Sequence, residues 1–126
     1  MSMRTPLGRV RGLGAAGTGT DHFWVQRVTA VAGIPLTVGF IVIVAMLVGR
    51  NHAATVQILA SPIVALTMIL FIATIVYHMW IGMQVIIEDY VNDPLHKAVV
   101  VMANTFFCCV MGLASIFAVL KISFGV

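Results

Sequence analysis

The chain has 126 residues, of which 61% are hydrophobic and only 9% carry a charge, and its formal net charge is +3. Soluble domains of this size do not normally have such a composition, so we expect an integral membrane protein. No polar segment is long enough for a separate catalytic domain, and chemistry would need a cofactor or partner chains. The excess of cations is better explained by membrane topology and anionic lipid headgroups than by nucleic acid.

Residues 1–22 are rich in arginine and glycine, with Asp21 as their only acid. An arginine-rich leader resembles a mitochondrial presequence, but the glycines oppose the amphipathic helix of such a leader. A secretory signal is also disfavoured, because the following apolar run can span a membrane and no small-residue cleavage site closes it. We expect a basic, flexible tail at a membrane surface.

Three long stretches after the tail contain no Asp, Glu, Lys or Arg, and each can cross an apolar layer of about 30 Å as a helix. These stretches cover residues 28–49, 51–87 and 98–120. Residues 23–126 are therefore predicted to form one all-α domain with three transmembrane helices. The expected helices cover about residues 24–48, 62–90 and 95–122.

The first span is expected to begin near Phe23 and Trp24, whose rings suit the headgroup layer. Pro35 is expected to bend it without a functional role, since membrane helices tolerate proline where neighbours satisfy the freed carbonyl.

Ser61-Pro62 predicts the start of the second span, as a capping hydroxyl followed by proline at the first helical position. A helix from there to Tyr90 would be about 43 Å long, so its last turns should leave the hydrocarbon core. Asp93 is expected to cap a third helix beginning at Pro94. The short loop predicts that the second and third helices are antiparallel neighbours, and the third is interpreted as scaffold.

The cations beside the spans predict the orientation. Arg27 and three arginines of the tail precede the first span and Lys97 lies between the second and third, whereas only Arg50 and Lys121 fall on the opposite side. The positive-inside rule then places the N-terminus in the cytoplasm and the C-terminus in the periplasm.

His78 is an ionisable residue within the second apolar run. Histidine at membrane depth is costly unless paired, which indicates a ligand, a relay or a contact to a neighbouring helix. The bland alternative is a hydrogen bond between helices, worth about 0.6 kcal/mol. Gly82, one turn further on, leaves room for a flat macrocycle against the helix, although glycine equally serves close helix packing.

Asp89 and Tyr90 follow His78 at the end of the same helix. Asp89 shares a face with His78, about 16 Å away along the axis. A tyrosine hydroxyl can donate to a carbonyl oxygen, and an aspartate can hold a partner arginine or accept a proton. The pair suits a quinone pocket, although both residue types are common where helices leave membranes. Our leading interpretation is a haem ligand above a quinone pocket.

The run HMWIGMQ at 78–84, followed by DYV at 89–91, resembles the second helix of the small haem-b membrane anchor of bacterial succinate dehydrogenase, the enzyme also called complex II. His22-Phe23, just ahead of Arg27 and the first span, is similar to the start of the same anchor. The resemblance covers most of the chain from His22 onward and implies a multi-pass protein of the bacterial inner membrane.

The resemblance also implies site residues. His78 would be one axial ligand of haem b, and the second histidine would come from a second membrane anchor subunit. Tyr90 would hydrogen-bond a ubiquinone carbonyl, and Asp89 would position a partner arginine. Arg27 is assigned to a haem propionate and Gly82 to packing against the haem.

The complete enzyme of that family oxidises succinate on a flavoprotein subunit and passes electrons through an iron–sulfur subunit to quinone. This chain has no flavin fingerprint and no cysteine array for clusters, as expected for its anchor. Three alternatives stay open. They are the anchor of a quinol:fumarate reductase, a small proton-coupled transporter, and a purely structural assembly subunit in which His78, Asp89 and Tyr90 are replaceable.

Overall fold

The computed structural model describes residues 5–12 and 19–125, and all regular structure in these residues is helical. Three helices are long and apolar enough to cross a membrane, which confirms the predicted all-α class with three spans. The helices are α1 (Pro6–Val10), α2 (Gly19–Leu47), α3 (His52–Leu59), α4 (Pro62–Tyr90) and α5 (Pro94–Phe124).

The segment expected to form a basic tail contains α1 and the start of α2. Thr5 caps α1, since its hydroxyl accepts a hydrogen bond of 3.1 Å from the Gly8 N–H. Helix α2 begins at Gly19, a few residues before the expected start near Phe23. Arg4 lies outside the described residues, and the flexibility of the tail stays a prediction.

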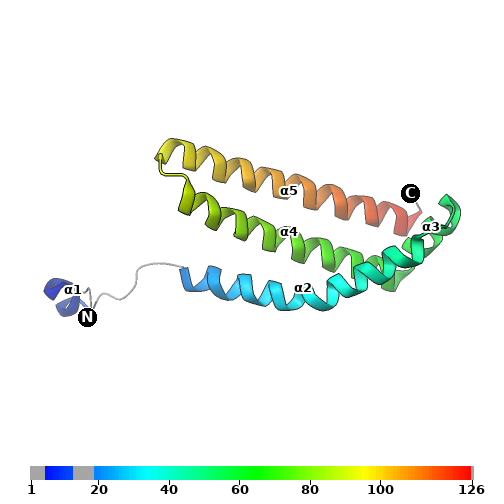
Figure 1. Cartoon of the computed structure of the whole chain (residues 1–126), viewed down its shortest axis with the longest axis horizontal. Coiled ribbons are helices and arrows are strands. Elements are labelled where there is room, and N and C mark those ends of the chain that lie inside the picture. The colour runs from blue at the N-terminus through cyan, green and yellow to red at the C-terminus, as the bar shows by residue number, and fades with distance from the viewer. Residues whose placement is uncertain (1–4, 13–18, 126) are drawn as a thin grey trace.

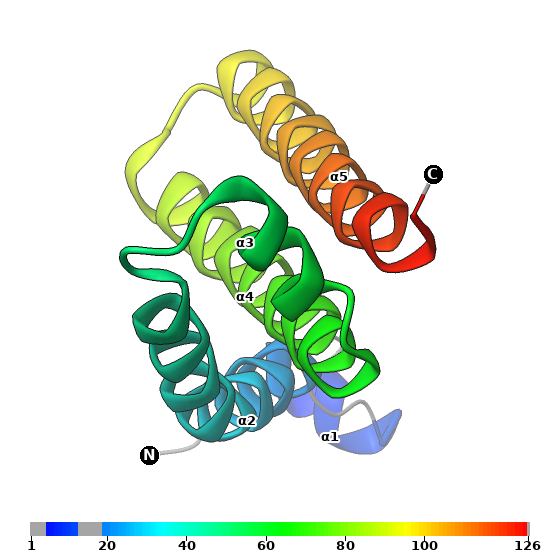
Figure 2. The ribbon, with the colours of Figure 1, turned by 90° about the vertical axis from the view of Figure 1, so that its right-hand side faces the viewer.

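Helix α2 changes direction along its length, as Figures 1 and 2 show, and Pro35 lies inside it. Proline has no N–H to donate to the carbonyl one turn earlier, which accounts for a bend in this part of the helix. Gly49 lies just beyond the end of the helix with φ +74°, a left-handed conformation that lets the chain change direction there.

Helix α3 was not expected from the sequence. Asn51 caps it, because its side chain accepts a hydrogen bond of 2.9 Å from the Ala54 N–H. Its apolar residues merge with the run of the second span, so hydropathy alone does not separate the two elements. At eight residues it is too short to cross a bilayer.

The expected bounds of the second span are confirmed, since α4 runs from Pro62 to Tyr90. The capping role of Ser61 was wrong: its backbone is extended as at an N-cap, but its side chain makes no capping hydrogen bond. Asp93 does cap α5 from Pro94, accepting a hydrogen bond of 3.2 Å from the His96 N–H.

Helix α4 lies between α2 and α5 and packs against both, while α3 packs against α4 and α5 at one end (Figures 1 and 2). On the α2 side, the Phe40 and Phe71 rings stack with centroids 4.5 Å apart. Helices α4 and α5 are antiparallel neighbours, as predicted. The start of α2, the end of α4 and the start of α5 lie at the same end of the molecule (Figure 1).

Polar side chains and one glycine join α4 to α5. Trp80 Nε1 donates to Thr105 Oγ1 at 3.0 Å, and Asn104 Nδ2 donates to the Trp80 carbonyl at 3.1 Å. Gly112 lies opposite Val76, where an added Cβ would be 3.2 Å from Val76 Cγ1. The hydrogen bonds satisfy polar groups between the two helices, and the glycine at position 112 lets α5 approach Val76 on α4 closely.

We expect Gly112→Leu to separate α4 from α5, because a leucine side chain has no room beside Val76. Overpacking of this kind costs about 1–3 kcal/mol. The control is Ala114→Leu, at an exposed position of the same helix. Thermal stability of the purified protein should fall for Gly112→Leu and stay near wild type for the control, and equal stability of the two variants would contradict the packing of α4 against α5.

Candidate functional site

His78 lies on the face of α4 that meets α2. Its Nδ1 is 2.9 Å from the hydroxyl oxygen of Thr29 on α2, and both residues are half-buried. The sequence positions are 49 residues apart, so this contact arises only from the packing of the two helices. His78 is therefore hydrogen-bonded across the interface between α2 and α4. Of its two ring nitrogens, only Nδ1 has a hydrogen-bond partner among the described residues.

An open groove of about 450 Å³ runs beside His78 between α2 and α4. Gly33 contributes to it, since an added Cβ there would meet no atom within 4 Å. The groove is mainly apolar, and its other polar lining groups are the hydroxyls of two threonines. The lining residues are Thr29, Ala30, Gly33, Ile34, Thr37, Val38, Ile75 and His78.

The groove offers few side chains that could ligate a metal. Within residues 5–12 and 19–125, no three His, Cys, Asp or Glu side chains cluster as a metal site. Among the residues that line the groove, His78 is the one whose side chain has a nitrogen that can ligate iron, and the rest of the lining is mainly apolar. This lining can therefore accept a largely apolar group that takes one ligand from this chain.

Gly82 lies one turn from His78, also toward α2. A Cβ added at Gly82 would be 3.9 Å from Gln26 Nε2, which is an ordinary contact distance. Helix packing within this chain therefore does not require glycine at this position, and its proposed role beside a haem stays a prediction.

Arg27 contacts its own helix. Its guanidinium carbon lies 3.6 Å from the centroid of the Phe23 ring, a cation–π contact one turn back along α2. Arg27 lies two residues before Thr29 in the sequence, on the side of the expected headgroup layer. In the described part of the chain, Arg27 and His78 form no hydrogen bond with each other.

The end of α4 presents three consecutive polar side chains with different surroundings. Glu88 is held within the chain: its carboxylate accepts from Gln84 at 3.0 Å, and its carbonyl accepts from Lys97 Nζ at 3.0 Å. Asp89 and Tyr90 are exposed, Tyr90 to 80%, and neither side chain has a hydrogen bond or ion pair with the described part of the chain. Both are available to a ligand or a neighbouring subunit.

In the part of the chain that the structure describes, His78 and the Asp89-Tyr90 pair do not line a common pocket. Both lie on α4, and about 16 Å of helix separates His78 from Asp89. The structure therefore places a histidine in the middle of α4 and an acid–phenol pair at its end.

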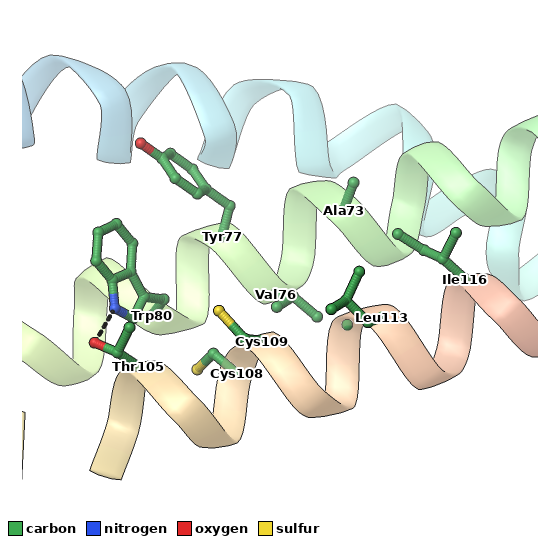
Figure 3. A pocket seen from close by; sticks show the side chains of 10 residues that line it. Ala73, Val76, Tyr77, Trp80, Thr105, Cys108, Cys109, Leu113 and Ile116 are labelled. Carbon is green, nitrogen blue, oxygen red and sulfur yellow. Dashed lines mark hydrogen bonds between the residues drawn. The ribbon is translucent and has the colours of Figure 1, made fainter. Parts of the chain in front are cut away.

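Sequence reasoning missed Thr29, although a hydroxyl inside a predicted span was a visible signal. It also missed a second groove, of about 340 Å³, between α4 and α5. Figure 3 shows Tyr77, Trp80, Cys108 and Cys109 around it, with the Trp80–Thr105 hydrogen bond at one end.

Comparison with known proteins identifies relatives along nearly the whole chain. The family described as "Succinate dehydrogenase/Fumarate reductase transmembrane subunit" matches residues 1–112. The succinate dehydrogenase hydrophobic membrane anchor subunit of Paracoccus denitrificans is 31% identical over 121 residues, covering 96% of this chain and 93% of that protein.

Other curated relatives have similar names. The succinate dehydrogenase hydrophobic membrane anchor subunit of Rickettsia bellii is 28% identical, with 92% of this chain and 93% of that protein covered. The succinate dehydrogenase membrane anchor subunit of Reclinomonas americana is 32% identical, with 65% of this chain and 71% of that protein covered. No solved structure matches the chain significantly.

Proposed function

Because this chain belongs to the succinate dehydrogenase/fumarate reductase transmembrane subunit family and is a membrane anchor subunit of succinate dehydrogenase, we propose that it binds haem b and forms part of the ubiquinone-reduction site. His78 would hold the haem iron and Tyr90 would contact the quinone. A second membrane anchor subunit would supply the other histidine, and the iron–sulfur and flavoprotein subunits would deliver electrons from succinate.

The observation that supports haem binding best is the environment of His78. One ring nitrogen is held by Thr29 at 2.9 Å, while the ring borders a groove that Gly33 leaves open. When bound, the haem would supply one-electron redox capacity at this level of the membrane. His78 would hold the iron, and the apolar walls of the groove would exclude water from it.

The second ligand has to come from outside this chain. His78 is the only one of the four histidines that lies in the middle of a described transmembrane helix. The groove between α2 and α4 is then the face that meets the second anchor. Arg27 would bind a haem propionate by moving its guanidinium from the Phe23 ring to a charge-assisted contact at the same interface.

The quinone site is proposed at the exposed end of α4. Tyr90 would donate a hydrogen bond from its hydroxyl to a ubiquinone carbonyl, while its ring stays against the isoprenoid side of the pocket. Asp89 would hold an arginine of a partner subunit close to the same carbonyl. The exposure of Asp89 and Tyr90 supports a role in binding quinone, because their side chains are free to contact a ligand. The neighbouring Glu88, by contrast, is hydrogen-bonded within the chain.

Placement in the membrane follows from the same assignment. The quinone site must face the soluble subunits, so the start of α2 and the end of α4 lie on the cytoplasmic side of the inner membrane. The cation distribution predicts the same orientation, with the C-terminus in the periplasm. The curated relatives named above are all succinate dehydrogenase subunits, which favours succinate oxidation over quinol:fumarate reduction.

The test is a reduced-minus-oxidised visible spectrum of the complex purified through a tag on this chain, with succinate as reductant. We expect a b-type band that appears with succinate, together with co-purified flavoprotein and iron–sulfur subunits. A complex that contains these subunits but shows no b-type band, even with dithionite, would contradict haem binding. Purification without any dehydrogenase subunit would contradict the anchor role in this complex.

A further inference from the structure

We propose that Thr29 is a positioning residue for His78: it holds the ring as the Nδ1–H tautomer and leaves Nε2 unprotonated for the haem iron. The inference rests on the proposed function, because it assigns the ligating nitrogen of the same histidine. It adds a hydroxyl group on α2 to a site whose proposed iron ligand lies on α4.

The Thr29 hydroxyl has three polar neighbours. Its oxygen lies 2.8 Å from the Val25 carbonyl oxygen, 3.0 Å from the Gln26 carbonyl oxygen and 2.9 Å from His78 Nδ1. A hydroxyl has one proton to donate and two lone pairs to accept with. Both carbonyl oxygens can only accept, so the short contacts to them require the hydroxyl proton.

The proton between Thr29 and His78 must then come from the histidine. If the hydroxyl proton pointed at Nδ1, two carbonyl oxygens would lie within 3.0 Å of the hydroxyl oxygen with no proton between them. If Nδ1 carries the proton instead, it donates to a threonine lone pair, and the hydroxyl proton is free for the two carbonyl oxygens. A neutral imidazole protonated at Nδ1 has its lone pair at Nε2.

This arrangement suits a metal ligand. Ligating histidines commonly donate their second ring N–H to a neighbouring acceptor, which fixes the ring orientation and raises the basicity of the ligating nitrogen. The bond also joins α2 to α4 at the level of the groove that His78 lines. Thr29 would thereby set both the direction of the imidazole and its electron donation.

The test compares Thr29→Val, which removes the hydroxyl while keeping the branched shape, with Thr29→Ser, which keeps the hydroxyl. Thr67→Val is the matched control. Thr67 also donates to a carbonyl one turn back, with 2.8 Å to Ile63, and packs at the α2–α4 interface, but it has no bond to His78. Each variant is purified as the complete complex.

Three properties are measured: the haem midpoint potential, the electron paramagnetic resonance spectrum of the ferric haem, and the rate of haem loss to apomyoglobin. We expect Thr29→Val to raise the potential, because a less basic ligand stabilises ferric iron less, to shift the ferric spectrum, and to weaken haem retention about 10-fold or more. Thr29→Ser should keep all three properties near wild type, and Thr67→Val should leave them unchanged.

Wild-type potential, spectrum and retention in Thr29→Val would overturn the positioning role. If Thr29→Val does not assemble, Thr29→Ala replaces it. Loss of assembly in both variants, with normal assembly of Thr29→Ser, would assign Thr29 to helix packing alone and also overturn the proposal. The proposed function is tested separately by His78→Ala: persistence of an unchanged haem in that variant contradicts haem ligation itself, whatever Thr29 does.

Discussion

His78→Ala is expected to weaken or abolish haem binding in the assembled complex, with a fall in haem content of about 10-fold or more. Alanine removes the only ligand that the described part of this chain offers in the groove and leaves the hydroxyl of Thr29 facing a cavity. The iron would keep only the ligand of the second anchor, so any retained haem should lose its normal bis-histidine spectrum. Haem content per flavin and the visible spectrum measure the effect.

His52→Ala is the control for this experiment, because His52 is exposed at the start of α3, at the opposite end of the molecule from the end of α4. It should leave haem content unchanged. An unchanged spectrum in His78→Ala would reduce His78 to a packing residue whose bond to Thr29 joins two helices. Absence of all partner subunits would indicate misassembly, and haem content would then be compared in His78→Gln.

Tyr90→Phe is expected to slow quinone reduction about 10-fold while sparing succinate oxidation with an artificial soluble acceptor. The change removes one hydroxyl and keeps the ring, so it deletes a hydrogen bond to the quinone carbonyl worth about 1–1.5 kcal/mol. Tyr90 is exposed in this chain, and its removal should therefore not disturb the packing of α4. The ratio of the two activities is the measurement.

Tyr77→Phe is the matched control, since it makes the same change on the same helix, beside the groove between α4 and α5. Its activity ratio should equal that of the wild type. Equal loss of both activities in Tyr90→Phe would point to a damaged complex. Wild-type quinone reduction would remove Tyr90 from the site and favour the view that it only anchors the helix end at the interface.

Much of the fold was predictable because the determinants of membrane helices are local. A backbone in lipid must satisfy its own hydrogen bonds, so long runs without charged residues have to become spanning helices. Pro62 and Asp93 marked helix starts correctly through their own backbone and side-chain chemistry. Helix α3 escaped detection because its residues are apolar like those of the span that follows it.

The candidate site residues were also recognisable from the sequence, but their roles were not. His78 stood out in the sequence because a histidine is unusual at membrane depth, and Asp89 and Tyr90 because they end the same helix. The sequence also carried enough of the family pattern to indicate an anchor of succinate dehydrogenase, and the comparisons agree with it. The individual roles of these residues stay predictions for the experiments above.

The sequence by itself determined the three spans and their approximate ends, because these depend on the transfer of single segments into lipid. It also determined the family, because the family motif is a matter of residue order. Only the tertiary structure decided that α4 is the central helix, that Thr29 contacts His78, and that Val76 packs closely against Gly112. Contacts between helices depend on which faces turn toward each other. That choice is made by small residues and polar bonds distant in sequence, and no local pattern specifies it.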